Sequence, residues 1–198
     1  MTYDNIQGDM FDFKDYYNKI ALELPDNCRI AESGVANGSS AIYLAERLTE
    51  LGKNFEFYFI DNMDYGGPKQ IAELVRNIGL SGLGHKIQLL PISSLDAAAS
   101  FNDNFFDFVF LDSSHEYKQT KAELIIWWQK VKTNCCLSGH DYYLYPDDVK
   151  MAVHELIPIV NVHTTEIGMY KSLEIYDTEK GYGVFEIRKN WQAKLKYE

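Results

Sequence analysis

Short runs rich in β-branched and aromatic residues alternate along this chain with amphipathic segments of helical length. This alternation constrains the fold more than any other feature, because parallel strands need a crossover connection, which is usually a helix. The runs that read as successive strands lie at residues 28–34, 55–60, 87–92, 105–111 and 135–138. The sequence therefore predicts an α/β protein built on a mostly parallel sheet.

Helices are expected between these strands and before the first one. Ile42, Ala45 and Leu48 share one face of the segment that follows the first strand, and this spacing is typical of an amphipathic helix. Gly79 and Pro158 each follow a helical segment and are expected to end it. The predicted helices cover residues 13–24, 39–51, 69–78, a short alanine-rich stretch capped by Ser94, 117–131 and 147–156.

The last part of the chain changes character. Residues 161–167 and 183–188 read as two strands joined by a long polar segment, which favours a closing antiparallel hairpin. With the five earlier strands they make a doubly wound, seven-stranded sheet with helices on both faces. No repeat or linker interrupts the pattern, so residues 1–198 are expected to form one domain, in which residues 1–26 are an N-terminal helical segment.

The balance of charges narrows the range of partners. The chain of 198 residues carries 29 acidic and 19 basic residues, a formal net charge of −10. Nucleic acids and anionic membranes bind clustered lysine and arginine, so we expect neither as a partner. No apolar run is long enough to cross a membrane and no secretion signal is recognisable, which favours a cytoplasmic protein. The cysteines are expected to be reduced core thiols.

In open α/β sheets, ligands bind beyond the carboxyl ends of the strands, and these ends are unusually polar here. The first strand carries Glu32 near its end, and the turn after it contains Gly34 and Gly38, which allow a tight turn and the close approach of a ligand. Ser39 or Ser40 can cap the next helix. A purely structural turn at a helix start is the alternative interpretation.

The second strand is followed by Asp61, 23 residues after Gly38. Nucleotide-binding βαβ units carry a ribose-binding carboxylate at about this spacing, so the two signals support each other. Ala36 and the spacing of the glycines break the G-x-G-x-x-G fingerprint of dinucleotide sites. NAD is therefore the weaker interpretation.

Acids and histidines also follow the fourth and fifth strands. Asp112 and His115 come after the fourth strand, and His140 and Asp141 come after the fifth. A single carboxylate here can simply cap a helix, but several acids and two histidines at one sheet edge favour a chemical role.

Four motifs occur in order along the chain: ESGVANG at 32–38, FLDSSHEY at 110–117, LSGHDY at 137–142 and YPDDV at 145–149. The first resembles the acid-x-Gly-x-Gly-x-Gly loop of class I methyltransferases that use S-adenosyl-L-methionine (AdoMet), with Ala36 in place of the middle glycine. The others are similar to the small-molecule O-methyltransferase family that includes macrocin O-methyltransferase and cephalosporin hydroxylase-like proteins. The resemblance spans residues 30–188 and implies a Rossmann-like fold and AdoMet-dependent methyl transfer.

The resemblance also implies how AdoMet would bind. The loop at residues 34–38 would pass under the methionine part, Asp61 would bind both ribose hydroxyls, and Glu32 would lie near the ammonium group. The residues after Asp61 would flank the adenine, and two serines after the third strand would reach its edge. The AdoMet-binding residues implied in this way are Glu32, Gly34, Gly38, Ser39, Ser40, Asp61, Asn62, Met63, Ser93, Ser94 and Asp112.

Two alternatives stay open for the chemistry. In related metal-dependent O-methyltransferases, a divalent cation is held at positions that correspond here to Asp112, His140 and Asp141. Because Mg²⁺ prefers oxygen ligands, His140 favours either Mn²⁺ or a metal-free site. Without a metal, a histidine would accept the proton of the acceptor. His115 is the leading candidate base, or else it orients Asp112 or Asp141, and the predicted catalytic residues are His115, Asp112 and His140.

We therefore expect methyl transfer to a small-molecule acceptor, with the hydroxyl oxygen of a sugar or secondary metabolite favoured. Tyr142, Tyr143 and Tyr145 are candidates for an aromatic wall or for simple packing. A non-catalytic AdoMet-fold binding protein and an NAD-type oxidoreductase or hydroxylase are the alternatives. The oligomeric state stays open, a homo-oligomer included.

Overall fold

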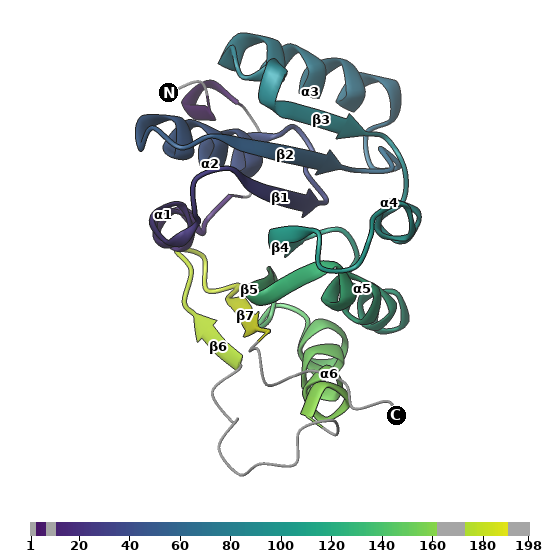
Figure 1. Ribbon diagram of the computed structural model, residues 1–198. Coiled ribbons are helices and arrows are strands. Elements are labelled where there is room, and N and C mark those ends of the chain that lie inside the picture. The colour runs from purple at the N-terminus through teal and green to yellow at the C-terminus, as the bar shows by residue number, and fades with distance from the viewer. Residues whose placement is uncertain (1–2, 7–10, 162–172, 190–198) are drawn as a thin grey trace.

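The computed structural model describes residues 3–6, 11–161 and 173–189 (Figure 1). Its seven strands form one sheet in the order β3-β2-β1-β4-β5-β7-β6. Strands β1 to β5 run parallel, and β7 pairs antiparallel with β5 and β6. The predicted sheet, mostly parallel with an antiparallel C-terminal pair, is thus confirmed. The strands are β1 (Cys28–Ser33), β2 (Phe55–Ile60), β3 (Ile87–Leu90), β4 (Phe106–Leu111), β5 (Val131–Gly139), β6 (Leu173–Tyr176) and β7 (Val184–Arg188).

Helices cover both faces of this sheet, as predicted. α1, α2 and α3 contribute to the core on one face, and α4, α5 and α6 to the core on the other (Figure 1). Within the described ranges, none of the helices is long and apolar enough to cross a membrane. The helices are α1 (Lys14–Glu23), α2 (Ser39–Glu50), α3 (Gly67–Ser81), α4 (Ser94–Ser100), α5 (Tyr117–Lys130) and α6 (Met151–Asn161), with short helical turns at Tyr3–Asn5, Gly84–Lys86 and Pro146–Lys150.

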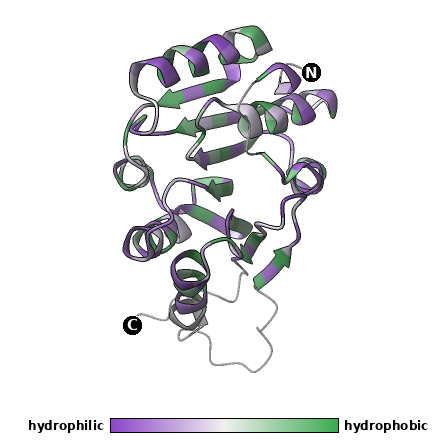
Figure 2. Ribbon diagram, turned by 180° about the vertical axis from the view of Figure 1, so that it is seen from behind, coloured by the Kyte–Doolittle hydropathy of each residue, from purple (hydrophilic) through white to green (hydrophobic). Residues whose placement is uncertain are grey.

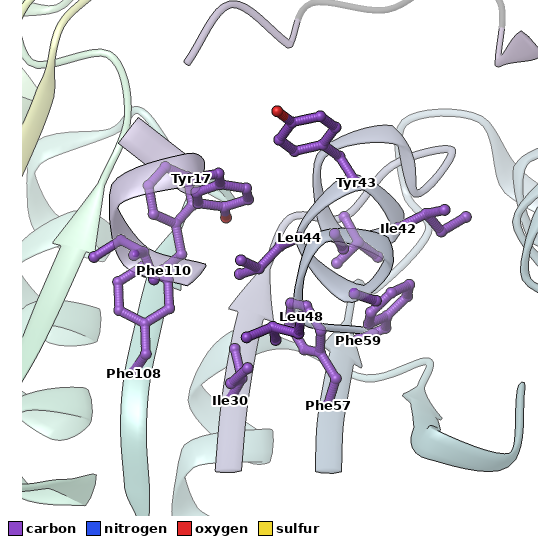
Figure 3. Packing of buried hydrophobic residues seen from close by; sticks show 14 of the residues in the cluster. Tyr17, Ile30, Ile42, Tyr43, Leu44, Leu48, Phe57, Phe59, Phe108 and Phe110 are labelled. Carbon is purple, nitrogen blue, oxygen red and sulfur yellow. The ribbon is translucent and has the colours of Figure 1, made fainter. Parts of the chain in front are cut away.

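Alternation along the strands divides the core into two layers. Phe108 and Phe110 of β4 pack in the layer of α1 and α2, near Tyr17 in Figure 3. Val109, between them, packs in the opposite layer with Trp127 of α5, which is fully buried. The helices alternate between hydrophilic and hydrophobic residues in Figure 2, as expected for helices that cover a sheet with one face.

Two helices run further than the sequence predicts. α3 passes Gly79 and ends at Ser81, because Gly82 takes the left-handed conformation, with φ +69°, and the buried Leu83 anchors the turn after it. α6 passes Pro158 and ends at Asn161, so the proline does not end this helix. A glycine or proline in the sequence therefore does not by itself fix where a helix ends.

The closing hairpin is present, but its first strand lies elsewhere. Asn161, the predicted start of that strand, is the last residue of α6, and residues 162–167 lie outside the described residues. β6 instead occupies Leu173–Tyr176, inside the segment predicted to be a polar connection. Leu173 and Ile175 are partly buried and pack against the core of the α5 face, which explains why this short stretch pairs with β7.

The serines predicted to cap helices act differently. The residue before α2 is Gly38, with φ +87°, which has no side chain that could cap this helix. α4 is capped by Ser93, whose Oγ accepts a hydrogen bond from the Asp96 N–H, while Ser94 is the first helical residue.

The carboxyl ends of β1 and β4 meet at Gly34. The Gly34 N–H donates to the carbonyl oxygen of Ile60 at 2.8 Å, and the Asp112 N–H donates to that of Ser33 at 2.7 Å. Gly34 has φ +91°, and a Cβ here would lie 2.0 Å from the carbonyl oxygen of Asp112. Only glycine fits, so this contact fixes the turn after β1 against the end of β4.

We expect Gly34→Ala to lower the free energy of unfolding by about 3 kcal/mol or more, because the added methyl group must separate two main-chain segments that meet at the centre of the sheet. Equilibrium unfolding in urea measures this loss. Gly52→Ala is the matched control, since Gly52 has φ +70° but open space around a Cβ. It should lose only the conformational cost of about 1–2 kcal/mol, and equal losses in both variants would contradict the steric argument.

Candidate functional site

The turn after β1 lies beside the acid that follows β2. Asp61 accepts hydrogen bonds from the N–H of Ala36 at 2.9 Å and from the N–H of Met63 at 2.7 Å. Ala36 has φ +45°, in the left-handed region that favours glycine. Ala36, which stands where the similar loop has its middle glycine, therefore keeps a glycine-like backbone. The turn at residues 34–38 is called the glycine turn below. The structure places the carboxylate predicted to bind ribose directly next to it.

The two residues that follow Asp61 differ in exposure. Asn62 is exposed, whereas Met63 is buried with φ +63°. On the other side of the turn, a Cβ at Gly38 would lie 2.7 Å from Leu74 of α3. The turn is thus held between two helices and the end of β2, with Asn62 accessible from solvent.

Glu32 lies below this turn and is fully buried. The hydroxyl of Tyr17 donates to one carboxylate oxygen at 2.7 Å, and the hydroxyl of Ser40 donates to the other. Ser39 is buried at the start of α2. Glu32 therefore ties the turn to α1 and α2, and its contact with a cofactor ammonium group stays a prediction.

The two serines after β3 are both engaged by the protein. Ser93 Oγ donates to Asp96 Oδ2 at 2.7 Å, and the buried Ser94 accepts a hydrogen bond from Trp127 Nε1 at 2.9 Å. Their predicted role at the adenine edge would require these hydroxyls to accept a further partner.

Asp112, His115 and Asp141 form one group at the carboxyl ends of β4 and β5, called the acid–histidine cluster below. Their ligand atoms all lie within 4.8 Å of one another. His115 Nε2 lies 2.7 Å from Asp141 Oδ2 and 3.8 Å from Asp112 Oδ1. This nitrogen is buried and, within the described residues, makes no hydrogen bond of normal geometry. The cluster offers two carboxylates and one imidazole nitrogen to a cation.

His140 lies behind this cluster rather than in it. Its Nε2 is hydrogen-bonded to Asp12 Oδ1 at 2.8 Å, and its Nδ1 lies 3.1 Å from Asp141 Oδ1. The ring contacts those of Phe13 and Tyr182, and the side chain is 4% exposed. The Nδ1 atom of His140 also lies 3.8 Å from Asp112 Oδ1, so both ring nitrogens face carboxylates. The group of ligand atoms that lie close together contains His115, and a metal-binding role of His140 stays a prediction.

Opposite charges hold the two histidines and Asp141 in their charged forms. Asp112 and Asp141 raise the pKa of His115 to about 9. Burial lowers the pKa of His140, but Asp112 and Asp141 outweigh it and raise that pKa to about 10. Burial likewise opposes ionisation of Asp141, yet His115 and His140 hold its pKa well below the ordinary value. Without a bound cation, the group is a network of paired charges.

The tyrosines that follow β5 have separate environments. Tyr145 stacks on the His115 ring, with centroids 4.5 Å apart and planes at 8°. Tyr142 is buried and hydrogen-bonded to His154 Nε2 at 2.7 Å, whereas Tyr143 is exposed. Of these three, Tyr145 is the one that contacts the cluster, which favours a packing role for Tyr142.

A small pocket opens beside the cluster and reveals an acid that the sequence did not single out. Its lining includes Asp112, His115, Thr120 and Glu123. Glu123 is buried, accepts a hydrogen bond from Ser113 Oγ at 2.8 Å, and has a pKa raised by burial. The sequence does contain a signal for Glu123, because it is an acid on the apolar face of the predicted helix, next to Leu124.

Asp12 is the second residue that sequence reasoning missed. It lies just before α1, is 2% exposed, and reaches His140 across 128 residues of sequence. No spacing rule connects positions so far apart, so only the folded structure reveals this pair.

A family model described as a methyltransferase domain matches residues 31–142. Solved structures share the fold at low identity. A predicted AdoMet-dependent methyltransferase from Methanococcus maripaludis has 13% identity and a TM-score of 0.59, with 90% of this chain and 85% of that chain covered. Cofactor-bound Rv0187 from MTB has 15% identity and a TM-score of 0.64, with 96% and 87% covered.

An rRNA methylase from Streptococcus thermophilus is also similar, at 12% identity and a TM-score of 0.63, with 89% of this chain and 95% of that chain covered. No curated protein sequence matches the chain significantly. The likeness to solved structures shows the fold of AdoMet-dependent methyltransferases. Because the family model spans more than half of the sequence, the chain belongs to the methyltransferase domain family.

Proposed function

We propose that this protein transfers the methyl group of AdoMet to a hydroxyl oxygen of a small acceptor, such as a sugar or a secondary metabolite, with the help of a divalent cation. The observation that carries this proposal is the acid–histidine cluster, which lies at the end of β4 where Asp112 touches Gly34 of the glycine turn. Donor and acceptor sites would therefore adjoin each other across a single main-chain contact.

The residues around the glycine turn fit AdoMet. The Asp61 carboxylate stands beside the backbone of Ala36, and Asn62 is accessible next to it. A carboxylate in this place can accept hydrogen bonds from two ribose hydroxyls. The turn leads into the N-terminus of α2, and the positive end of the helix dipole there favours the carboxylate of the methionine part.

The acid–histidine cluster fits a divalent cation. His115 Nε2 lies 2.7 Å from Asp141 Oδ2 and 3.8 Å from Asp112 Oδ1, so a cation that replaced its proton would have three ligand atoms within reach. Two oxygen donors and one nitrogen donor favour Mn²⁺ over Mg²⁺. When bound, a divalent cation supplies positive charge that favours the ionised form of a nearby hydroxyl group.

The chain's own residues would provide orientation. In-line methyl transfer requires the acceptor oxygen to be held close to the methyl carbon. Tyr145, stacked on His115, fixes the plane of the imidazole, and the main chain of Asp112 is fixed by its contact with Gly34. The small pocket beside Asp112, His115 and Thr120 has room for about one water molecule, so it could admit the hydroxyl group of an acceptor whose body stays outside it.

A nucleic-acid acceptor is disfavoured by charge. The formal net charge of the chain is −10, and the proposed acceptor site adjoins the carboxyl groups of Asp112 and Glu123. A phosphate backbone would be repelled there unless basic residues compensated it. This supports a small hydroxylated acceptor over RNA, although the fold is shared with an rRNA methylase.

Asp61→Ala should weaken AdoMet binding about 10- to 100-fold, since charge-assisted hydrogen bonds to the ribose are lost. Isothermal titration calorimetry with AdoMet and S-adenosyl-homocysteine measures the change. Glu73→Ala, which removes an exposed acid of α3, is the control and should bind normally. Unaltered binding by Asp61→Ala, or binding of NADH in place of AdoMet, would contradict the proposed cofactor site.

Mn²⁺ should stabilise the wild-type protein by about 2.7 kcal/mol at a concentration of 100 times Kd. Asp112→Asn should abolish most of this gain, because a ligand charge is removed, whereas Asp147→Asn, which alters an exposed acid near β5, should keep it. Thermal unfolding with Mn²⁺ or with EDTA measures the effect. If millimolar Mn²⁺ leaves the wild-type Tm unchanged, the cation has no place in the proposal.

The acceptor class can be tested through the release of S-adenosyl-homocysteine from AdoMet. We expect release with one or more members of a panel of sugars, phenols and hydroxylated metabolites, and inhibition of this release by EDTA. Release that depends on added RNA, and on none of the small acceptors, would overturn the proposed acceptor class.

A further inference from the structure

A buried carboxylate from the N-terminal segment supports the candidate site from behind. Asp12 lies just before α1, and its side chain has no exposed surface. Its Oδ1 is hydrogen-bonded to His140 Nε2 at 2.8 Å, and its Oδ2 accepts a hydrogen bond from the Lys180 N–H at 3.0 Å. Both oxygens therefore have partners, as a buried carboxylate requires.

The position of Asp12 is itself fixed by the connection between β6 and β7. The carbonyl oxygen of Asp12 accepts a hydrogen bond from the Glu179 N–H at 3.1 Å, in addition to the bond from Lys180 to its side chain. Two main-chain donors from one turn thus hold both the backbone and the carboxylate. The N-terminal segment and the C-terminal hairpin together aim Asp12 at His140.

His140 connects Asp12 to Asp141. The imidazole lies between Asp12 Oδ1 at 2.8 Å and Asp141 Oδ1 at 3.1 Å. The ring therefore bridges the two carboxylates, with one nitrogen next to each of them. The aromatic contacts of Phe13 and Tyr182 prevent the ring from turning away.

The side chain of Asp141 is held by two histidines. Its backbone has φ +61°, in the left-handed region that aspartate and asparagine occupy more readily than other non-glycine residues. One carboxylate oxygen faces His140, and the other faces His115 at 2.7 Å. The orientation of Asp141 in the acid–histidine cluster is thus set by the partner behind it.

We propose that Asp12 is a positioning residue that, through His140, holds Asp141 ready to bind the divalent cation. This inference rests on the cation site of the proposed function. It assigns to His140 the role of a bridge, in place of a metal ligand or a base. Partners of this kind typically change metal affinity 10- to 100-fold when they are removed, since they orient the residue that binds the metal.

The test measures Mn²⁺ binding by electron paramagnetic resonance, in which bound Mn²⁺ loses the signal of the free ion. Asp12→Asn keeps the size of the side chain but removes its charge, and we expect it to weaken Mn²⁺ binding by about 10- to 100-fold. The affinity for AdoMet, measured by calorimetry on the same sample, should be unchanged, because the glycine turn and Asp61 do not contact Asp12.

Asp107→Asn is the matched control. Asp107 is also a buried carboxylate, paired with Lys132 at 2.8 Å and with the Arg29 N–H at 2.8 Å, but it lies near the start of β4, at the opposite end from the cluster. It should lose stability without losing Mn²⁺ affinity. If Asp12→Asn does not fold, His140→Gln removes the bridge from its other end, and the same weakening of Mn²⁺ binding is expected.

The outcomes separate the two proposals. Wild-type Mn²⁺ affinity in Asp12→Asn, or equal weakening in Asp12→Asn and Asp107→Asn, would overturn the positioning role and leave Asp12 as an anchor of the N-terminal segment. In both results the wild-type protein still binds Mn²⁺, so the proposed function stands. If the wild-type protein binds AdoMet but no Mn²⁺, the cation site itself is wrong, and the positioning role is overturned with it.

Discussion

The contact between Gly34 and the main chain of Asp112 is the constraint on which the arrangement of the site depends. β1 and β4 are neighbours at the centre of the sheet, where the order of strands reverses, and their carboxyl ends touch there. A crevice at such a reversal is the usual ligand site of open α/β sheets. Here the turn expected to bind the methyl donor rests on the residue that begins the acid–histidine cluster. The sheet topology therefore brings donor and acceptor sites together before any side chain is considered.

Periodicity and turn residues predict the five parallel strands of the sheet. The residues of β2 in the structure are those predicted, because apolar side chains fill both faces of a central strand and leave little ambiguity. Prediction failed where local signals compete. Gly79 and Gly82 look alike in sequence, and only the second ends α3, since the buried Leu83 follows it. β6 alternates apolar and polar residues, as a half-buried strand does, but it is only four residues long and its pairing with β7 is a tertiary event.

The sequence predicts where the residues of the candidate site lie, but it does not predict the role of each residue. Strand-end reasoning places Asp112, His115, His140 and Asp141 at one edge, and the structure agrees on this placement. It could not distinguish the two histidines, because their roles depend on what lies behind each ring. One nitrogen of His140 faces the carboxylate of Asp12, which is remote in sequence, whereas His115 faces Asp112 and Asp141.

Charge supplies the last link between the fold and the proposed chemistry. Asp12, Asp112 and Asp141 place three carboxylates around two histidines in a largely buried region. Even with both imidazoles protonated, one negative charge remains in excess. Burial makes such an excess costly unless a cation or a paired group compensates it. A divalent cation that replaced the proton of His115 would add to the positive charge of the site and would relieve this excess. The acidic character of the chain argues against nucleic acid at its surface. At the acid–histidine cluster, the same excess of carboxylates favours a bound cation.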